Sequence, residues 1–484
     1  MSNIRHFLRD AYTLTDRLLL TRLPESARSS LVSWLLVCAR WIHPSGHWPT
    51  SAASLLVRRT LRAPQKHMQM LPSWAVQDLR DLSVTVDPLL APEIVLDQRP
   101  QAFLTPVHWT QAGHAYEQLR RSIGNRQFDT VLLIPWLKRG GADLGALHHA
   151  RALHEAFGQR VLVLATEPGD SPWANRLDDA TPFVECGHLL ATLSLPHGEP
   201  EVVLARLLVQ LAPTRIHIIN SHTGWRMLQR FGKAIRQRTR VFASLYCDEF
   251  EADGRRTGLA QQFLPTCLPW LDAVITDNAA SPTAWRDSIG VDPSLFQVVH
   301  FPAPEVPSLP PNRSINPKRL LWASRLERQK RPDLVVELAS SMPEFHWDVH
   351  GAALSVDDEN LRRLKALSNV SIRGSYERFS DIVGPEHLAY IYTSCWDGLP
   401  NVLLEATASG IPVIAPQIGG ISDLIPTDML VPANASAVDY SVAVRNLMDP
   451  ATRAEWIQIQ SNAVSSFTWE RFVASLQQIP GYAH

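Results

Sequence analysis

Two acidic residues stand eight positions apart where a glycine-containing loop meets a predicted helix. Asp397 precedes Gly398 in the loop, and Glu405 lies on the helix that begins near Pro400. Proline suits the first helical turn because it has no N–H to leave unpaired and its φ is already helical. From these positions both carboxylates can reach one ligand, and the free N–H groups and positive dipole of the helix start favour an anion.

Short apolar segments on both sides position this helix. Residues 388–392 and 412–415 predict buried strands, and Gly410 predicts a left-handed end to the helix. A strand–loop–helix–strand order places the loop and the helix start at the carboxyl end of a parallel sheet. Apolar residues recur at helical spacing within the helix, and those expected to face inward are Val402, Leu403, Ala406 and Ala408.

An arginine and a lysine occupy the loop of another strand–loop–helix segment, residues 319–338. Arg325 and Lys330 follow an apolar strand and precede an amphipathic helix. A forked guanidinium and a compact ammonium can together neutralise a pyrophosphate leaving group. Two such residues in a loop can equally be a solvated pair without a ligand.

Residues 393–425 closely resemble the acidic-x7-acidic signature of the family 4 retaining glycosyltransferases. Arg325 and Lys330 are spaced as in that family's Arg-Leu-x3-Lys element. The resemblance covers about residues 128–480. It implies the GT-B fold, in which two Rossmann-like domains face a cleft, and a nucleotide-diphosphate sugar as the donor. An ordinary βαβ unit with surface acids is the alternative, but it does not account for the Gly-Leu-Pro-Asn loop at 398–401.

The resemblance implies a role for each donor-side residue. The acid matching Glu405 holds the ribose hydroxyls in relatives, and the acid matching Asp397, usually a glutamate, accepts a hydrogen bond from the sugar. Segment 370–379 is similar to the family's base-binding turn, in which Arg373 and Gly374 would frame the nucleobase; a plain strand-end turn is the alternative. The backbone N–H groups expected to hold sugar hydroxyls and phosphate are those of Gly398, Leu399, Asn401 and Val402.

Two adjacent glycines follow the first strand of an earlier strand–helix block. Gly140 and Gly141 let the backbone approach a ligand closely, and they resemble the Gly-Gly loop of the family's acceptor domain, which closes over the diphosphate and the sugar. Neighbouring Lys138 and Arg139 either add to this anion site or are solvated loop cations. His222, just past a later strand, could hydrogen-bond an acceptor hydroxyl or carry a proton, with a helix-capping or core histidine as the alternative.

The acceptor side departs from the family at one place. Relatives carry a Thr-x-His-Asp-like element after the next strand, whereas this chain has Tyr-Cys-Asp at 246–248. We therefore expect Asp248 or Glu249 to be the polar group in the acceptor cleft. Asp277 and Asn278 end a strand that usually ends in serine in the family.

Strand–helix alternation in two blocks divides the chain of 484 residues. We expect an α-helical N-terminal module at 1–125, a Rossmann-like acceptor domain at 126–302, a Rossmann-like nucleotide-sugar domain at 303–466 and a C-terminal crossover helix at 467–484. The Pro-rich stretch 301–317 predicts the link between domains, because proline stiffens a chain and interrupts helices and central strands. The predicted fold class is α/β, with two doubly wound parallel sheets and a cleft at the carboxyl ends of their strands.

Composition argues against several functional classes. Basic and acidic residues number 46 and 47, so the charge gives no reason to expect nucleic acid as a partner. The five cysteines are scattered without CxxC pairs, which argues against a disulfide framework or a zinc site and fits a reducing cytoplasm. No apolar run is long enough to span a bilayer, and charged residues interrupt any signal-peptide pattern. The sequence thus predicts a cytoplasmic protein.

The first 70 residues are basic, with ten Lys or Arg against three acids. Stretches 4–23 and 26–42 have apolar residues at helical spacing, and the second carries Trp34 and Trp41. Such helices can lie peripherally on an anionic membrane surface, here the inner face of the cytoplasmic membrane, or pack on the first domain or on a partner. Membrane contact and protein contact both stay open for this module.

The resemblance implies transfer of a hexose from a nucleotide-diphosphate sugar to a glycan or lipid-linked acceptor, with retention of configuration, in cell-surface polysaccharide biosynthesis. The donor is a substrate, so no cofactor is expected. No metal is expected either, because Arg325, Lys330, the helix start and the Gly140-Gly141 loop supply the positive field. A GT-B phosphorylase or epimerase, a non-catalytic GT-B scaffold and a nucleotide-binding regulator are the alternatives.

Overall fold

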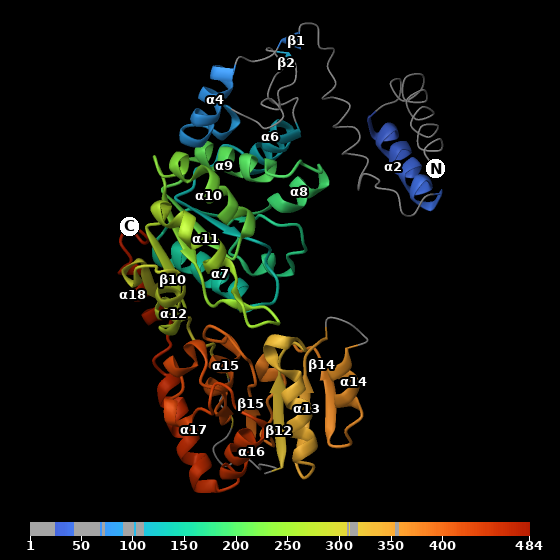
Figure 1. Ribbon diagram of the computed structural model, residues 1–484, viewed down its shortest axis with the longest axis vertical. Coiled ribbons are helices and arrows are strands. Elements are labelled where there is room, and N and C mark those ends of the chain that lie inside the picture. Colours follow the sequence, from blue (N-terminus) through green and yellow to red (C-terminus); the bar gives the residue numbers. More distant parts are fainter. Residues whose placement is uncertain are drawn as a thin grey trace.

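The computed structural model describes residues 25–42, 68–69, 73–90, 101–102, 111–306, 309, 318–353 and 358–484. Two parallel sheets, each accompanied by helices, form two domains that lie one above the other in Figure 1. The predicted α/β class with two doubly wound parallel sheets is confirmed. Among the described residues, no helix is both long and apolar enough to cross a bilayer.

The first sheet has seven strands in the order β11-β10-β7-β6-β3-β4-β5, all parallel. Every residue of β3, β4 and β6 is buried, as expected for strands covered by helices on both faces. The sequence missed the edge strand β5, which is short and not buried. The bounds are β3 Thr130–Ile134, β4 Val161–Ala165, β5 Phe183–Glu185, β6 Arg215–Ile219, β7 Arg240–Ser244, β10 Ala273–Thr276 and β11 Phe296–Val298.

Successive residues of β3 alternate between two apolar cores. Leu133 packs in a core that includes helices α9 and α10, whereas Leu132 packs in a core that includes α7 and the C-terminal helix α18. Helices α4 and α6 lie against α10 and α9, at the end of the first domain away from the second domain (Figure 1). The bounds are α4 Ser73–Thr85, α6 Gln111–Ile123, α7 Gly141–Arg151, α8 Cys186–Thr192, α9 Glu199–Leu211, α10 His222–Ile235, α11 Leu259–Cys267, α12 Ala280–Ile289 and α18 Trp469–Gln477.

The second sheet has five parallel strands in the order β14-β13-β12-β15-β16. Helix α15 begins at Asn401, so Pro400 is the residue before the helix rather than part of its first turn. Leu403 and Ala406 of this helix are buried as expected, whereas Val402 and Ala408 are only partly buried. The bounds are β12 Arg319–Ala323, α13 Pro332–Ser341, β13 His346–His350, α14 Glu359–Lys365, β14 Val370–Gly374, β15 Ala389–Ile391, α15 Asn401–Ser409, β16 Val413–Ile414, α16 Ala437–Asn446 and α17 Pro450–Val464.

Within the N-terminal region, α2 spans Glu25–Ile42 and confirms the helix predicted for 26–42. Strands β1 (Met68–Gln69) and β2 (Gln101–Ala102) form a short antiparallel pair that the sequence did not predict. The helix predicted for 4–23 and most of the Pro-rich stretch lie outside the described residues.

The end of the chain returns to the first domain after leaving the second. The hydroxyl of Tyr482 lies 2.8 Å from Nδ1 of His217 on β6 and 2.8 Å from Nδ1 of His149 on α7. Nε of Arg215 donates to the carbonyl of Gly481 at 2.6 Å. Segment 469–483 thereby joins the core of the first domain and ties the two domains together.

Candidate active site

The two predicted acids lie where β15 leads into α15. Gly410 ends α15 in the left-handed conformation, with φ of 75°, as the sequence predicted. The loop before α15 packs against the Gly419-Gly420 turn so closely that a Cβ on Gly419 would lie 1.9 Å from the carbonyl oxygen of Asp397. Since Gly419 also has φ of 47°, only glycine fits there, and this contact fixes the path of the acid-bearing loop.

Asp397 is the centre of a polar cluster at the end of β15. Its Oδ2 forms an ion pair with Nζ of Lys330 and accepts a hydrogen bond from the hydroxyl of Tyr392. The same ammonium lies 3.2 Å from the Tyr392 hydroxyl. Burial, followed by the negative charge of Asp397, raises the pKa of Tyr392 well above its usual value, so the phenol stays a donor. Asp397 and Lys330 are thus brought together as the sequence predicted, and Tyr392 joins them.

Arg325 lies on the same loop as Lys330, and its guanidinium pairs with Glu327 at 2.8 Å. The Arg325 side chain is 66% exposed, whereas that of Lys330 is only 14% exposed. Both predicted diphosphate cations therefore already contact a carboxylate of the chain. A diphosphate can take the place of these carboxylates because its oxygens offer the same charge-assisted hydrogen bonds.

Glu405 lies on α15 and is partly buried. Burial raises the pKa of this carboxyl, and the positive charge of Arg139 opposes the rise. The Arg139 guanidinium comes from the first domain and lies 4.2 Å from the ring centre of Tyr376 in the second domain. Burial and the charge of Glu405 raise the pKa of Tyr376 to about 12. Arg139 is therefore a cross-domain contact beside Glu405, and its part in the anion site stays a prediction.

The Gly140-Gly141 loop faces the start of α15. Nδ2 of Asn401 donates to the carbonyl of Gly141 at 3.3 Å, which joins the two predicted ligand loops across the domains. Asp143 closes the glycine loop by accepting a hydrogen bond from the N–H of Lys138 at 2.9 Å. Gly140 precedes α7 in an extended conformation, and α7 begins at Gly141.

His222 is the first residue of α10 and is exposed. Ser221 caps the helix, because its Oγ accepts a hydrogen bond from the N–H of Gly224 at 2.8 Å, so the capping alternative for His222 is wrong. The His222 ring faces Phe263, with the ring centres 6.5 Å apart. Within the described chain, no hydrogen bond or ion pair joins His222 to the acids of the second domain.

Arg373 and Gly374 end β14 in different environments. Gly374 has φ of 75° and forms the predicted turn. Nε of Arg373 instead donates to Oδ1 of Asp348 at 3.0 Å, beside Arg319 and His387. Burial favours the neutral form of Asp348, but hydrogen bonds from these three partners outweigh it and hold the pKa of Asp348 below its usual range. The Arg373 side chain therefore pairs with Asp348 on the neighbouring strand β13. Tyr376 is the aromatic residue of this turn that contacts the first domain.

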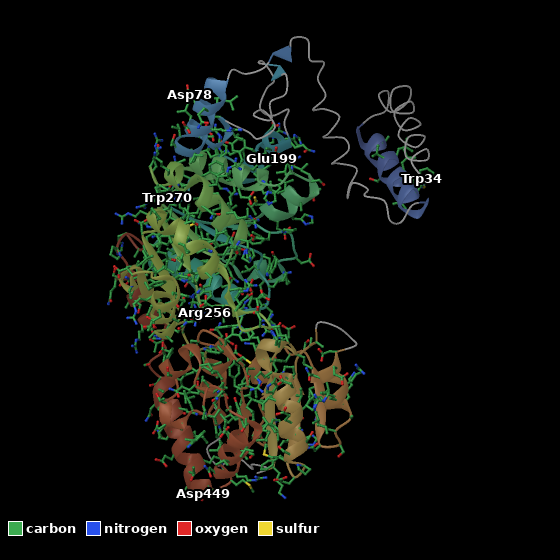
Figure 2. All side chains as sticks on the ribbon, viewed as in Figure 1. Trp34, Asp78, Glu199, Arg256, Trp270 and Asp449 are labelled. Atoms are coloured by element: carbon green, nitrogen blue, oxygen red, sulfur yellow. The ribbon has the colours of Figure 1, made fainter. Side chains whose placement is uncertain are left out.

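The segment that departs from the family continues into a β-hairpin, β8 (Glu249–Phe250) with β9 (Arg256–Thr257). The Phe250 ring lies 5.4 Å from the ring of Trp396, and Arg328 donates hydrogen bonds to the carbonyls of Phe250 and Glu251. Figure 2 shows Arg256 at the boundary between the domains. The sequence did not predict this hairpin, because its strands are two residues long and carry no alternating pattern.

Asp248, one of the two expected acceptor-cleft acids, is buried by its own domain. It accepts a hydrogen bond from Nε1 of Trp285 at 2.9 Å and lies 3.4 Å from the Arg256 guanidinium. Burial raises the pKa of Asp248 while these partners lower it. Glu249 is the exposed member of the pair.

The chain resembles known proteins both in sequence and in structure. Residues 317–449 match the family described as glycosyl transferases group 1. The crystal structure of Anabaena HepE in complex with UDP superposes with a TM-score of 0.55 at 16% identity, over 72% of this chain and 98% of HepE. The fold is GT-B.

Curated relatives of this GT-B chain match mainly by part of their length. A D-inositol 3-phosphate glycosyltransferase of Pseudarthrobacter chlorophenolicus is 28% identical over 217 residues, which are 43% of this chain and 47% of the relative. The O-antigen biosynthesis glycosyltransferase WbnH of Escherichia coli is 24% identical over 139 residues, which are 29% of this chain and 40% of WbnH. The chain therefore spans about half the length of the curated relatives it matches.

Proposed function

We propose that this protein is a retaining glycosyltransferase of family 4 type. It transfers a hexose from a nucleotide-diphosphate sugar to a glycan or lipid-linked acceptor during cell-surface polysaccharide assembly. The observation that carries the proposal is the Lys330–Asp397 ion pair next to the start of α15, opposite the Gly140-Gly141 loop. A cation for the diphosphate, an acid for the sugar and a helix terminus for the phosphate thus share one place between two domains. The relatives named above support a sugar-transfer reaction of this kind.

The chemistry requires a polarised leaving group more than a strong base. The acceptor oxygen forms a bond to the anomeric carbon as the bond from that carbon to the phosphate oxygen breaks. The acceptor proton passes to the departing phosphate on the same face of the sugar, which accounts for retention. Arg325, Lys330 and the N–H groups at the start of α15 stabilise the negative charge that develops on the diphosphate. These fixed charges act without a metal ion in the proposed reaction.

A donor panel tests the proposal. Release of nucleoside diphosphate is measured with UDP, GDP and ADP sugars, with and without polysaccharide or lipid-linked acceptors, and the anomeric configuration of the product is read by NMR. We expect one sugar nucleotide to be consumed, faster with acceptor, and the product to keep the configuration of the donor. Binding of nucleotide without consumption of any sugar would favour the regulator, and absence of all nucleotide binding would favour the scaffold. An inverted product would contradict the retaining mechanism.

We also propose that α2 contacts an anionic membrane surface on the cytoplasmic side. Leu31, Trp34 and Val37 recur along α2 at helical spacing, and the exposed fractions of Trp34 and Val37 are 62% and 61%. Figure 2 shows Trp34 on α2. The basic charge of the first 70 residues complements anionic lipid. Sedimentation with phosphatidylglycerol vesicles should pellet the protein, and phosphatidylcholine vesicles should pellet less. A Trp34→Ser, Val37→Ser variant that pellets as well as the parent would overturn this contact.

A further inference from the structure

The turn between β10 and α12 of the first domain, called the junction below, contacts two segments of the second domain. The junction comprises Asp277, Asn278 and Ala279, between β10 and α12. On one side, Oδ2 of Asp277 accepts a hydrogen bond from the N–H of Leu399 at 3.2 Å. On the other, the N–H of Ala279 donates to Oδ2 of Asp423 at 2.7 Å. Two acids, one from each domain, therefore accept a backbone N–H from the opposite domain.

The contact at Asp277 is close and well supported from its own domain. A Cβ on Gly398 would lie 2.8 Å from Oδ1 of Asp277 and 2.9 Å from the carbonyl oxygen of Tyr246, so the absence of a side chain permits the approach. Nδ2 of Asn278 donates to Oδ1 of Asp277 at 2.7 Å and to the Tyr246 carbonyl at 2.8 Å. Asp277 is buried, with 5% of its surface exposed, so its oxygens depend on these donors.

This contact changes the role predicted for one backbone group. The sequence assigned the Leu399 N–H to the ligand, but a buried carboxylate from the first domain already occupies it. Leu399 lies two residues after Asp397 and two before the first residue of α15. The hydrogen bond from Leu399 to Asp277 therefore also restrains the segment that carries Asp397, the acid proposed for the donor sugar.

We propose that Asp277 is a positioning residue that holds the donor-sugar loop, residues 397–400, from the opposite domain. The sugar subsite is then complete only when the two domains are together, whereas the diphosphate contacts of Lys330 and α15 belong to the second domain alone. This inference rests on the proposed function for its consequence in catalysis, but the contact itself can be tested without a substrate.

Hydrogen–deuterium exchange of the ligand-free protein tests the contact. Asp277→Ala should speed exchange in a peptide that covers Leu399 by about tenfold or more, because its N–H loses a buried acceptor. Asp423→Ala is the matched control: it removes the second cross-domain acceptor of this junction, which contacts Ala279 and His300 but, among the described residues, forms no hydrogen bond to the donor-sugar loop. Equal exchange at Leu399 in the parent and in Asp277→Ala, or the same increase in Asp423→Ala, would overturn the proposal.

Ligand binding tests the consequence. With the sugar nucleotide that the donor panel selects, Asp277→Ala should weaken binding by about tenfold, the scale of one hydrogen bond to a charged group. Binding of the matching nucleoside diphosphate should stay within about twofold, and Asp277→Asn, whose amide oxygen can still accept from Leu399, should restore part of the loss. A purely structural role would weaken both ligands equally.

Two further results keep the outcomes distinct. If Asp277→Ala does not fold, as judged by thermal melting, Gly398→Ala replaces it, because the added Cβ would push the loop away from Asp277. Unchanged exchange at Leu399 in Gly398→Ala would then count against the proposal. If the parent binds no sugar nucleotide while the exchange result holds, the proposed function fails but the positioning contact stands.

Discussion

Lys330 and Asp397, the cation expected at the diphosphate and the acid expected at the sugar, form one ion pair. Tyr392 donates to the same carboxylate oxygen, so each partner is neutralised or hydrogen-bonded although both are largely buried. Loss of either charge leaves the other buried without its partner, which is costly in a site shielded from water. In the folded protein the two residues therefore stabilise each other's buried charge.

Arg325→Ala and Lys330→Ala should each lower turnover by about two to three powers of ten, the range for losing one preorganised charge at a leaving group. Steady-state rates with the selected donor measure this effect. Arg378→Ala is the control, because the Arg378 side chain is 78% exposed and pairs with Asp381, three residues along the chain. Near-normal rates in both site variants, with the fold intact, would remove these cations from the site.

Asp397→Ala and Glu405→Ala should differ in which ligand they weaken. Asp397→Ala should weaken binding of the sugar nucleotide but leave the nucleoside diphosphate almost unchanged, whereas Glu405→Ala should weaken both because ribose is common to them. A hydrogen bond to a charged group contributes roughly 1.5–3 kcal/mol, about ten- to hundredfold in affinity, which titration calorimetry resolves. Equal losses for the two ligands in Asp397→Ala would contradict its assignment to the sugar.

Activity should survive exhaustive chelation. The proposed leaving-group stabilisation comes from Arg325, Lys330 and the N–H groups of α15, which EDTA does not remove. The measurement is the rate of donor consumption after dialysis against EDTA, with magnesium or manganese added back to a parallel sample. Complete loss that either ion restores would show that the reaction depends on a metal.

The free energy of unfolding should depend on pH through the titration of Asp277. Burial, more than the negative charge of Asp397, raises the pKa of Asp277 to about 7, although hydrogen bonds from Asn278 and Leu399 lower it. Between the ordinary carboxyl pKa of about 4 and this value the folded state binds more protons than the unfolded state, so the free energy of unfolding falls as pH rises.

An Asp277→Asn variant isolates this contribution because the amide does not titrate. Its melting temperature relative to the parent should rise from about pH 5 to about pH 8. Melting curves of both proteins in the same buffers provide the measurement. A difference that is constant with pH would mean that Asp277 is already ionised at the lower pH.

Tyr482→Phe should destabilise the protein without altering donor affinity. The substitution removes the hydroxyl that bridges His217 and His149, whose pKa values burial holds low, and leaves two buried imidazole nitrogens without that partner. We expect the free energy of unfolding to fall by about 1–3 kcal/mol. Denaturant titration measures the loss, and nucleotide binding measured in parallel checks that the donor site is intact. An unchanged midpoint would mean that water replaces the hydroxyl at no cost.

The sequence by itself indicated most strands of the two parallel sheets and the local chemistry around the start of α15. Apolar runs separated by glycine and proline predicted the strands around Asp397, and Gly410 ends α15 in the conformation that its lack of a side chain allows. Arg325, Lys330, Asp397 and Glu405 were proposed as site residues because their spacing from a strand end or a helix start resembles that of a family motif, and this assignment stays a prediction. Such signals depend on residues that are close together in the chain, so the local backbone conformation is enough to produce them.

Only the tertiary structure decided which groups face one another across the domains. The contacts of Asp277 with Leu399 and of Arg139 with Tyr376 join residues far apart in the chain. Arg373 pairs with Asp348 instead of with a ligand in the cleft because of the face of β14 on which its side chain lies. Tyr392 had no signal at all, since a tyrosine at the end of a buried strand looks like any core residue. The packing of the two domains decides these partners. A buried charge is costly unless it is hydrogen-bonded or paired, and the available partners are those that the tertiary structure places beside it.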